Sequence, residues 1–591
     1  LLKDGSAFRR YLAGTKSPFA VLINYGAANF ASATEAQAAW KLLNGELRDQ
    51  FLGWISGESV GFVWDEAAQH LKISPEVTRT RLLSAHRDFY TEALARKWSA
   101  MFRTPAGAMW PQMIPAQSTS STSFAHALAE WGVHLLGIET AAVQPMTAMR
   151  IAFARGAARQ YGGDFLYYHA PNFGDSATTF TRQQNFAGPD NFFHSHYGVT
   201  MGPSLSWYRK SYYLYYMSGA SAIYLEQGFD QFFKPGPGEH PFQLNPLGRL
   251  TAEFVRFAEQ HPDRGEPYTP IAFLLDPAHG WDMTDYPQWP FGISPVNRSD
   301  RALRELFGAA YYPGPVREGE PANGERQAFV PGVFGDIFDV LVASDTRGEA
   351  IDSYRGLIAG GQITWTNLWA KSLADYVRRG GTVVLNAAQV NGLSNDFLGV
   401  RLRGETGEAH NAICLSPGEP AQDLHGQVFR YEKIDLKGAQ PLITTTLNEP
   451  LVTVNRLGRG KVVFIAVPDL LGEDERLVPL AAHVLAHLAA DATPVNVEGN
   501  VEYLINRNSR GWVVTIFNDN GVFKPQQGLA QVDRSATVRV TISLRNASIS
   551  SANEWTSEQS LTIERKSESR DRVGLNIAAG GLAVVELITG R

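Results

Sequence analysis

The stretch of sequence that decides the fold is His134–His169, HLLGIETAAVQPMTAMRIAFARGAARQYGGDFLYYH. It begins with an apolar run that ends in Glu139, continues with the amphipathic segment Thr147–Tyr161, and closes with a second apolar run, Asp164–His169. An apolar run, a helix and another apolar run are the pattern of a βαβ unit, whose strands lie in one parallel sheet. The stretch therefore predicts an α/β fold.

The same alternation extends through the first third of the chain and predicts a (β/α)8 TIM barrel over residues 1–265. The predicted strands are Phe19–Tyr25, Phe51–Ser56, Ala108–Met113, His134–Glu139, Asp164–His169 and Ala220–Glu226. The predicted helices are Thr34–Leu47, Pro75–Arg103, Ser123–Trp131, Thr147–Tyr161, Leu205–Met217 and Leu247–Gln260. Either two strands are weak in sequence or the first two lie upstream of Leu1, and the helix-like start Leu1–Gly14 favours the second interpretation.

A second α/β pattern occupies residues 266–495 and predicts a flavodoxin-like domain. His261–Thr269 (HPDRGEPYT) is polar, carries two prolines and is predicted to be the linker that leads into it. The predicted strands are Pro270–Leu275, Ile337–Val342, Gly356–Ala359, Thr382–Asn386 and Lys461–Val467. The predicted helices are Arg301–Ala310, Asn367–Arg379 and Arg476–Leu488, the second of them ended by the Gly380-Gly381 pair. We expect a β-rich insertion at 398–455 to interrupt this domain.

The last part of the chain, residues 496–591, changes to short alternating strands separated by turn residues such as Asn518-Asp519-Asn520-Gly521. This pattern predicts a small antiparallel β-sandwich. Its predicted strands are Val501–Ile505, Trp512–Phe517, Ala536–Ile542, Leu561–Glu564 and Leu582–Leu587.

The composition excludes several classes of protein. The chain of 591 residues is 44% hydrophobic and 11% aromatic, which is enough for large cores and excludes general disorder. A net charge of −6 argues against a nucleic-acid partner, because such domains are normally basic. The single cysteine, Cys414, excludes a disulfide framework and a cysteine-based metal site. No apolar run approaches the about 20 residues that span a bilayer, and no phosphate-binding glycine motif follows a strand. We predict no membrane span and no cofactor.

Three glutamates each follow an apolar run, at the place where the chemistry of a βα barrel is located. Glu58 ends FLGWISGE, Glu139 ends HLLGIE and Glu226 ends ASAIYLE. Two facing carboxyl groups can cleave a glycosidic bond, because one donates a proton to the leaving oxygen while the other attacks the anomeric carbon or activates water. For any one of them the alternative is a structural glutamate that pairs with an arginine or caps the next helix.

Residues that suit a carbohydrate surround these strand ends. Aromatic rings stack on sugar faces, and the long polar loop Ala170–Pro203 could supply groups that bind hydroxyls. The predicted substrate-binding residues are Trp54, Trp110, His169, Asn172, Asp175, His194, His196 and Trp207. His194-Ser195-His196 has no third ligand at a recognised spacing, so no metal site is predicted. The stripe Tyr208, Tyr212, Tyr215, Tyr216 has helical spacing and is predicted to be core packing.

Three longer segments resemble barrel proteins of bacteria that are classed as glycosidases. They are GIETAAVQPMTAMRIAFARGAARQYGG (Gly137–Gly163), GPSLSWYRKSYYLYYMSGASAIYLEQG (Gly202–Gly228) and LGRLTAEFVRFAEQHPDRGEPYTPIAFLLDPAHGWD (Leu247–Asp282). The domain order is similar to that of family 42 type β-galactosidases: a catalytic barrel, a flavodoxin-like trimerisation domain and a C-terminal β-domain.

That resemblance implies a retaining glycosidase with paired glutamates. We expect Glu139 to be the acid/base and Glu226 the nucleophile, with Glu58 as the substitute for either. The sequence departs from the family in one respect. The family's acid/base follows an asparagine, whereas Ile138 precedes Glu139 and Gly57 precedes Glu58.

The middle domain resembles class I glutamine amidotransferase domains in outline, but the expected strand-to-helix turn, Ala359-Gly360-Gly361-Gln362, has no cysteine. We therefore expect this domain to be catalytically inert and to serve packing or the assembly of a homodimer or homotrimer. We expect Cys414 to be a small buried residue.

The predicted partner is an oligosaccharide or polysaccharide. The alternatives are a non-catalytic carbohydrate-binding or assembly protein and a polysaccharide lyase. We expect a bacterial protein that is secreted or periplasmic, with the cytoplasm as the alternative.

Overall fold

The computed structural model describes most of the chain. The described residues are 3–22, 30–57, 79–94, 99–115, 124–140, 147–169, 204–225, 232–235, 238, 242–277, 303, 306–307, 309–311, 334–344, 346–415, 422–423, 428–468, 478–524, 529–545, 547–565 and 571–590. The chain divides into two compact units. The first comprises Leu1–Glu139, Phe153–Tyr167 and Pro277–Val296, and the second comprises Thr140–Ala152, Tyr168–Asp276 and Asn297–Arg591.

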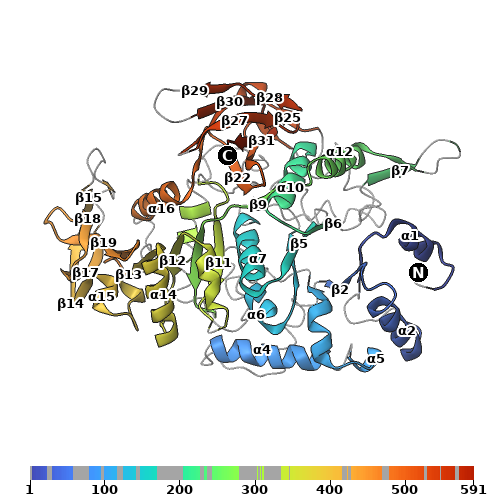
Figure 1. The fold of residues 1–591 in the computed structure, drawn as a ribbon, viewed down its shortest axis with the longest axis horizontal. Coiled ribbons are helices and arrows are strands. Elements are labelled where there is room, and N and C mark those ends of the chain that lie inside the picture. The colour runs from blue at the N-terminus through green and yellow to red at the C-terminus, as the bar shows by residue number, and fades with distance from the viewer. Residues whose placement is uncertain are drawn as a thin grey trace. The chain divides into compact units, whose positions relative to one another are not determined.

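The first unit contains short strands and the helices between them, coloured blue to cyan in Figure 1. Its strands are β1 (Phe19–Leu22), β2 (Phe51–Gly57), β3 (Met113–Pro115), β4 (Leu135–Thr140) and most of β5 (Asp164–His169). Its helices are α1 (Ala7–Thr15), α2 (Ala33–Asn44), α4 (Arg79–Leu94), α5 (Ala100–Phe102), α6 (Phe124–Trp131) and the latter part of α7 (Thr147–Tyr161). β1 and β3 pair with β2, both in parallel, and β4 and β5 lie in another sheet. The parallel α/β organisation is thus present, while closure into a barrel stays a prediction.

One predicted strand of this unit is wrong. Ala108–Met113 forms mainly two 3-10 turns, η3 (Ala106–Ala108) and η4 (Trp110–Gln112), and only its last residue enters β3. Pro111 lies in the first turn of η4. Because proline fixes φ near −65° and has no amide hydrogen, it suits a helical turn and cannot donate to a strand ladder.

A nine-stranded mixed sheet forms the middle of the second unit. Its order is β11-β10-β12-β13-β20-β19-β18-β15-β16. The first five strands are parallel: β11 (Phe338–Val342), β10 (Ile271–Leu275), β12 (Gly356–Gly360), β13 (Thr382–Asn386) and β20 (Gly460–Ile465). The others are antiparallel: β19 (Pro450–Leu457), β18 (Gln440–Thr444), β15 (Asn411–Cys414) and β16 (Gln422–Asp423).

The β-rich segment predicted at 398–455 lies in sequence between β13 and β20, which pair directly in this sheet. Strands β15, β16, β18 and β19 come from it and extend the sheet beyond β20. Only β14 (Val400–Ala409) and β17 (Phe429–Leu436), with α15 (Asn395–Leu398) before them, stand apart, as a two-stranded antiparallel ribbon. β19 and β20 form a tight antiparallel hairpin. The free edge of β19 then offers backbone hydrogen-bonding groups with which the next antiparallel strand can pair.

Helices α14 (Asn367–Arg379) and α16 (Val478–Ala492) also belong to this region (Figure 1). Trp369, Leu373 and Tyr376 on one face of α14 join the buried core beside the sheet. Thr366 caps its first turn, and Gly380 ends it with φ of 122°, a left-handed conformation that costs glycine little. The predicted ending of this helix is confirmed.

Two antiparallel sheets form the C-terminal β region, residues 495–589. One has the order β21-β26-β30-β29, and the other β28-β27-β31-β23-β22-β9. The first contains β21 (Val495–Glu498), β26 (Val538–Leu544), β30 (Asp571–Ile577) and β29 (Ile563–Arg565). The second contains β28 (Gln559–Ser560), β27 (Ile549–Glu554), β31 (Leu582–Thr589), β23 (Gly511–Phe517), β22 (Glu502–Arg507) and β9 (Glu266–Pro267). A short pair, β24 (Val522–Phe523) and β25 (Gln531–Val532), lies beside them in sequence.

The prediction that His261–Thr269 is a simple linker is wrong, because part of this segment forms strand β9. Glu266 and Pro267 pair with Arg507 and Asn506 of β22, so the segment is an edge strand of the C-terminal β region. An edge position tolerates proline, because one side of the strand makes no ladder. The segment therefore ties the C-terminal β region to the helix that precedes it, α12 (Pro246–Gln260).

Candidate functional site

Glu139 lies at the carboxyl end of β4, as predicted from the sequence. Leu136 and Ile138 of this strand are fully buried, which fixes the strand in the core of the first unit. The Glu139 side chain is half-buried, and its Oε2 atom is enclosed and shielded from solvent. A shielded carboxylate at a strand end suits acid/base chemistry better than a solvated surface glutamate does.

His169 is the last residue of β5 and is fully buried in the second unit. Its Nδ1 atom lies 2.9 Å from the hydroxyl of Tyr215. The rings of Trp207, Tyr208 and Tyr215 lie 5.2, 5.6 and 5.6 Å from the imidazole, between centroids. We call these four residues the His169 box. Burial in this box lowers the pKa of His169 to about 3, because a charged imidazole would lose its hydration there.

Helix α10 (Leu205–Met217) supplies the aromatic side of the His169 box. Ser204 caps it by accepting a hydrogen bond from the amide of Trp207 at 3.0 Å. Positions 208, 212 and 215 recur on one face because a helix repeats every 3.6 residues. The packing prediction for the tyrosine stripe is confirmed for Tyr208, Tyr212 and Tyr215, which are buried, whereas Tyr216 is half-buried. What sequence reasoning missed is the hydrogen bond of Tyr215 to His169, since spacing places a side chain on a face but does not identify its partner.

Helix α10 also contacts the C-terminal β region, which belongs to the same unit. Lys210 donates to Asp519 at 2.7 Å, with side-chain exposures of 0% and 3%. Asn506 donates to the carbonyl of Met217 at the end of the helix. The turn Asn518–Gly521 predicted from sequence therefore carries a buried counter-ion for a helix that lines the His169 box.

Two tryptophans predicted to bind substrate are core residues of the first unit. Trp54 has no exposed surface, packs against Phe51 and Phe102, and donates from Nε1 to Gln112 at 3.2 Å. Trp110 is 7% exposed and packs edge to face on Trp131. Their rings are covered by neighbours on the same unit, so they stabilise the core rather than offering a face to a sugar.

The structure therefore brings together two of the predicted site residues, His169 and Trp207, and places Glu139 at a strand end. Trp207 is fully buried and forms a wall of the box. The remaining predictions concern residues outside those that the structure describes: Glu58, Glu226, Asn172, Asp175, His194 and His196.

Among the described residues, no group of three or more His, Cys, Asp or Glu side chains is placed to hold a metal ion. Cys414 is buried, as predicted, and its Sγ atom lies 3.5 Å from Nε2 of His483. Within the described ranges, no helix has the length and apolar character required to span a membrane.

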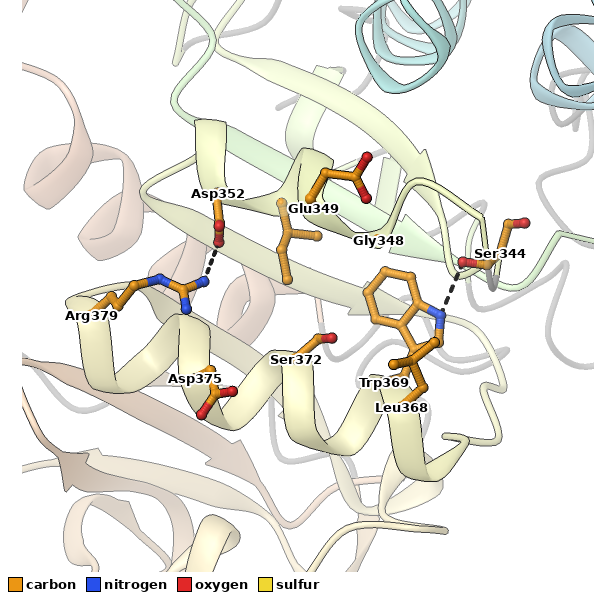
Figure 2. A pocket seen from close by; sticks show the side chains of 10 residues that line it. Ser344, Gly348, Glu349, Asp352, Leu368, Trp369, Ser372, Asp375 and Arg379 are labelled. Carbon is orange, nitrogen blue, oxygen red and sulfur yellow. Dashed lines mark hydrogen bonds and ion pairs between the residues drawn. The ribbon is translucent and has the colours of Figure 1, made fainter.

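A surface groove of about 300 Å³ lies between α14 and the 3-10 helix η6 (Gly348–Ser353) (Figure 2). Figure 2 shows Arg379 reaching from α14 to the Asp352 carboxylate, and Trp369 donating from Nε1 to the carbonyl of Ser344, at 3.1 Å. Glu349 and Asp375 add acidic side chains. Each of these three carboxylates lies beside an arginine: Asp352 beside Arg379, Asp375 beside Arg378 at 2.9 Å and Glu349 beside Arg347 at 3.8 Å. The groove therefore does not present the pair of available carboxyl groups that glycoside cleavage requires.

Comparisons with known proteins identify the fold. No protein-family model matches the sequence, and no curated protein matches it. Among solved structures, a β-galactosidase from Bacillus circulans sp. alkalophilus aligns over 94% of this chain and 81% of its own, with a TM-score of 0.54 and 12% identity. An α-L-fucosidase isoenzyme from Paenibacillus thiaminolyticus aligns over 95% and 80%, with a TM-score of 0.55 and 13% identity. A cold-adapted β-galactosidase from Rahnella sp. R3 aligns over 94% and 81%, with a TM-score of 0.52 and 13% identity. The fold of this chain is therefore one that glycoside hydrolases use.

Proposed function

We propose that the protein is a glycoside hydrolase that cleaves O-glycosidic bonds by a retaining mechanism with two glutamates. The observation that carries the proposal is the shielded carboxylate of Glu139 at the end of β4. The similarity of fold to β-galactosidases and a fucosidase supports the same class of reaction. The proposal includes a homo-oligomer that forms through the region of the nine-stranded sheet. Its support is the resemblance of the domain order to that of family 42 type β-galactosidases.

In this proposal Glu139 donates a proton to the leaving oxygen, and Glu226 attacks the anomeric carbon to form a glycosyl-enzyme. Water then hydrolyses the intermediate, with Glu139 acting as the base. The proposal requires these two carboxyl groups to lie about 5–5.5 Å apart in the active enzyme. Glu58 is the substitute if either role belongs elsewhere.

The test is hydrolysis of a panel of aryl glycosides by E139Q, E226Q and E58Q variants. We expect losses in kcat/KM of at least about 100-fold for two of the three, and retention of anomeric configuration followed by proton NMR. Added azide should restore turnover of an alanine variant at the nucleophile and yield a glycosyl azide. Glu253 of α12, an exposed partner of Arg209 of α10, provides the control E253Q.

Two outcomes would contradict the proposal. Full hydrolysis by all three glutamine variants would remove the glutamates from the mechanism. An unsaturated product absorbing in the ultraviolet would identify a lyase instead.

A further inference from the structure

Leu447 lies at the tip of the turn that joins β18 to β19, and it is 79% exposed. The turn is held from inside, because the buried Thr445 hydroxyl accepts hydrogen bonds from the amides of Leu447 and Glu449, both at 3.2 Å. The Thr445 amide donates to the carbonyl of Glu449 at 2.8 Å, and Asn448 has a left-handed φ of 62°. Turn residues are mostly small or polar. A rigid turn that holds a large apolar side chain in solvent suits an anchor for another protein surface.

A pocket of about 180 Å³ lies beside the same hairpin, between α16 and the strands β13, β18, β19 and β20. Aliphatic side chains form most of its walls, among them Ile443, Val452 and Val484. His487 at its rim is exposed, so the pocket opens at the surface. An apolar cavity of about 150 Å³ accommodates benzene, so this pocket has room for the smaller side chain of a leucine.

The surroundings of the anchor and of the pocket are complementary. Leu415 and Leu442 lie on adjacent strands beside the pocket and are 48% and 37% exposed, which extends the apolar surface. Lys461 and His487 bring hydrogen-bond donors to the rim of the pocket. Glu449, two residues after Leu447, would bring a carboxylate to these donors when the anchor enters such a pocket.

The position of the anchor relative to the pocket selects both the occupant and the symmetry. Leu447 lies in the sequence of the hairpin between Ile443 and Val452, and both of these residues line the pocket. A twofold pair uses one patch that contains both halves of the contact, so that each copy gives its anchor to the other. A ring of three copies instead needs two different patches, which face different neighbours. An anchor and a pocket on one hairpin therefore fit a twofold pair of identical chains.

We propose that two copies of this chain associate about a twofold axis at the β18–β19 hairpin, with Leu447 of each copy seated in the pocket beside α16 of the other. The inference rests on the homo-oligomer of the proposed function and names its contact and its symmetry. It gives a dimer, whereas the resemblance to family 42 type β-galactosidases implies a trimer. It does not depend on glycoside hydrolysis.

Sedimentation velocity over a range of protein concentrations measures the association. The wild type should sediment with twice the mass of the chain. L447D places a carboxylate in the apolar pocket and should raise the dimer dissociation constant at least about 30-fold. V484F fills the pocket from α16 and should have the same effect while leaving the turn unchanged. The matched control is L529D, at another exposed leucine of the second unit, which should sediment as the wild type does.

Cross-linking tests the contact itself. In a C414A background, which removes the single cysteine and should itself remain a dimer, chains with L447C are mixed with tagged chains with H487C. A short bismaleimide should join one tagged chain to one untagged chain. A mixture of L529C chains with the tagged H487C chains should give no such product.

The outcomes separate this inference from the proposed function. A monomer, a trimer, or a dimer that L447D and V484F leave intact would overturn the inference, and hydrolysis of aryl glycosides by that protein would leave the hydrolase standing. A dimer that both variants dissociate, in a protein that hydrolyses no glycoside, would support the inference and contradict the hydrolase. Circular dichroism identical to that of the wild type shows that a dissociated variant is folded.

Discussion

The burial of His169 predicts how the stability of the protein depends on pH. Its pKa falls from 6.5 in an exposed setting to about 3 in the folded protein, because burial disfavours the charged ring. The unfolded chain therefore binds a proton between these pH values that the folded chain does not. The free energy of unfolding should decrease as pH falls through this window, by at most about 1.4 kcal/mol per unit, and level off below it.

Chemical unfolding followed by tryptophan fluorescence between pH 7 and 4 measures this dependence. H169Q and H169N cannot titrate, so both should show a shallower loss of stability than the wild type. Equal slopes in all three proteins would mean that His169 is hydrated and titrates normally in the folded state.

At the scale of elements, the attachment of α10 to the C-terminal β region depends on the Lys210–Asp519 pair. Both side chains are buried, so D519A leaves an ammonium without its counter-ion and should destabilise the protein by about 3–5 kcal/mol. The double variant K210M/D519L should cost much less, because it removes both charges. The matched control is D491A in the more exposed Lys461–Asp491 pair, which should cost less than about 1 kcal/mol.

A double-mutant cycle by denaturant unfolding gives these energies. Equal costs for D519A and D491A would show that water reaches Lys210 in the folded protein.

The end of α14 gives a second prediction at this scale. An alanine at position 380 would place its Cβ 3.8 Å from that of Arg459, an ordinary contact, so the penalty of G380A is conformational and arises from φ of 122°. We expect a loss of about 1–2 kcal/mol in the free energy of unfolding. G14A, within α1 and with open space around it, should be neutral or stabilising. A stability of G380A equal to that of wild type would mean that the turn can adopt another conformation.

At the scale of the whole molecule, the second unit depends on its C-terminal residues. β9 pairs with β22, Asn506 holds the end of α10, and Asp519 neutralises Lys210. A chain that ends at Pro494 should therefore fail to form a stable second unit, instead of leaving the preceding α/β region intact. Circular dichroism and hydrogen exchange would check this, with full-length D519N as the control for loss of the ion pair alone. Native-like protection of β10, β12 and β13 in the shortened chain would contradict it.

Much of the element structure is local and could be predicted. Thr147–Tyr161, Asp164–His169, Leu205–Met217, Asn367–Arg379 and Thr382–Asn386 form the helices and strands expected of them, with the same bounds. Apolar periodicity and caps such as Ser204 and Gly380 act within a few residues, so a single sequence reveals them. What the sequence does not reveal is long-range: the linker interpretation of His261–Thr269 misses β9, and the sequence does not show that β18 and β19 extend the sheet beyond β20, because a strand depends on a partner distant in sequence.

What the sequence by itself determined is the α/β alternation, the burial of the tyrosine stripe and the placing of Glu139 and His169 at strand ends. Only the tertiary structure decided that Trp54 and Trp110 belong to the core and that Tyr215 holds one nitrogen of His169. It also decided that Lys210, an ordinary charged position in the sequence of α10, meets Asp519 in the interior. The physical reason is the same throughout. Periodicity specifies which face of an element is buried, whereas the identity of the group across that face depends on how distant segments pack.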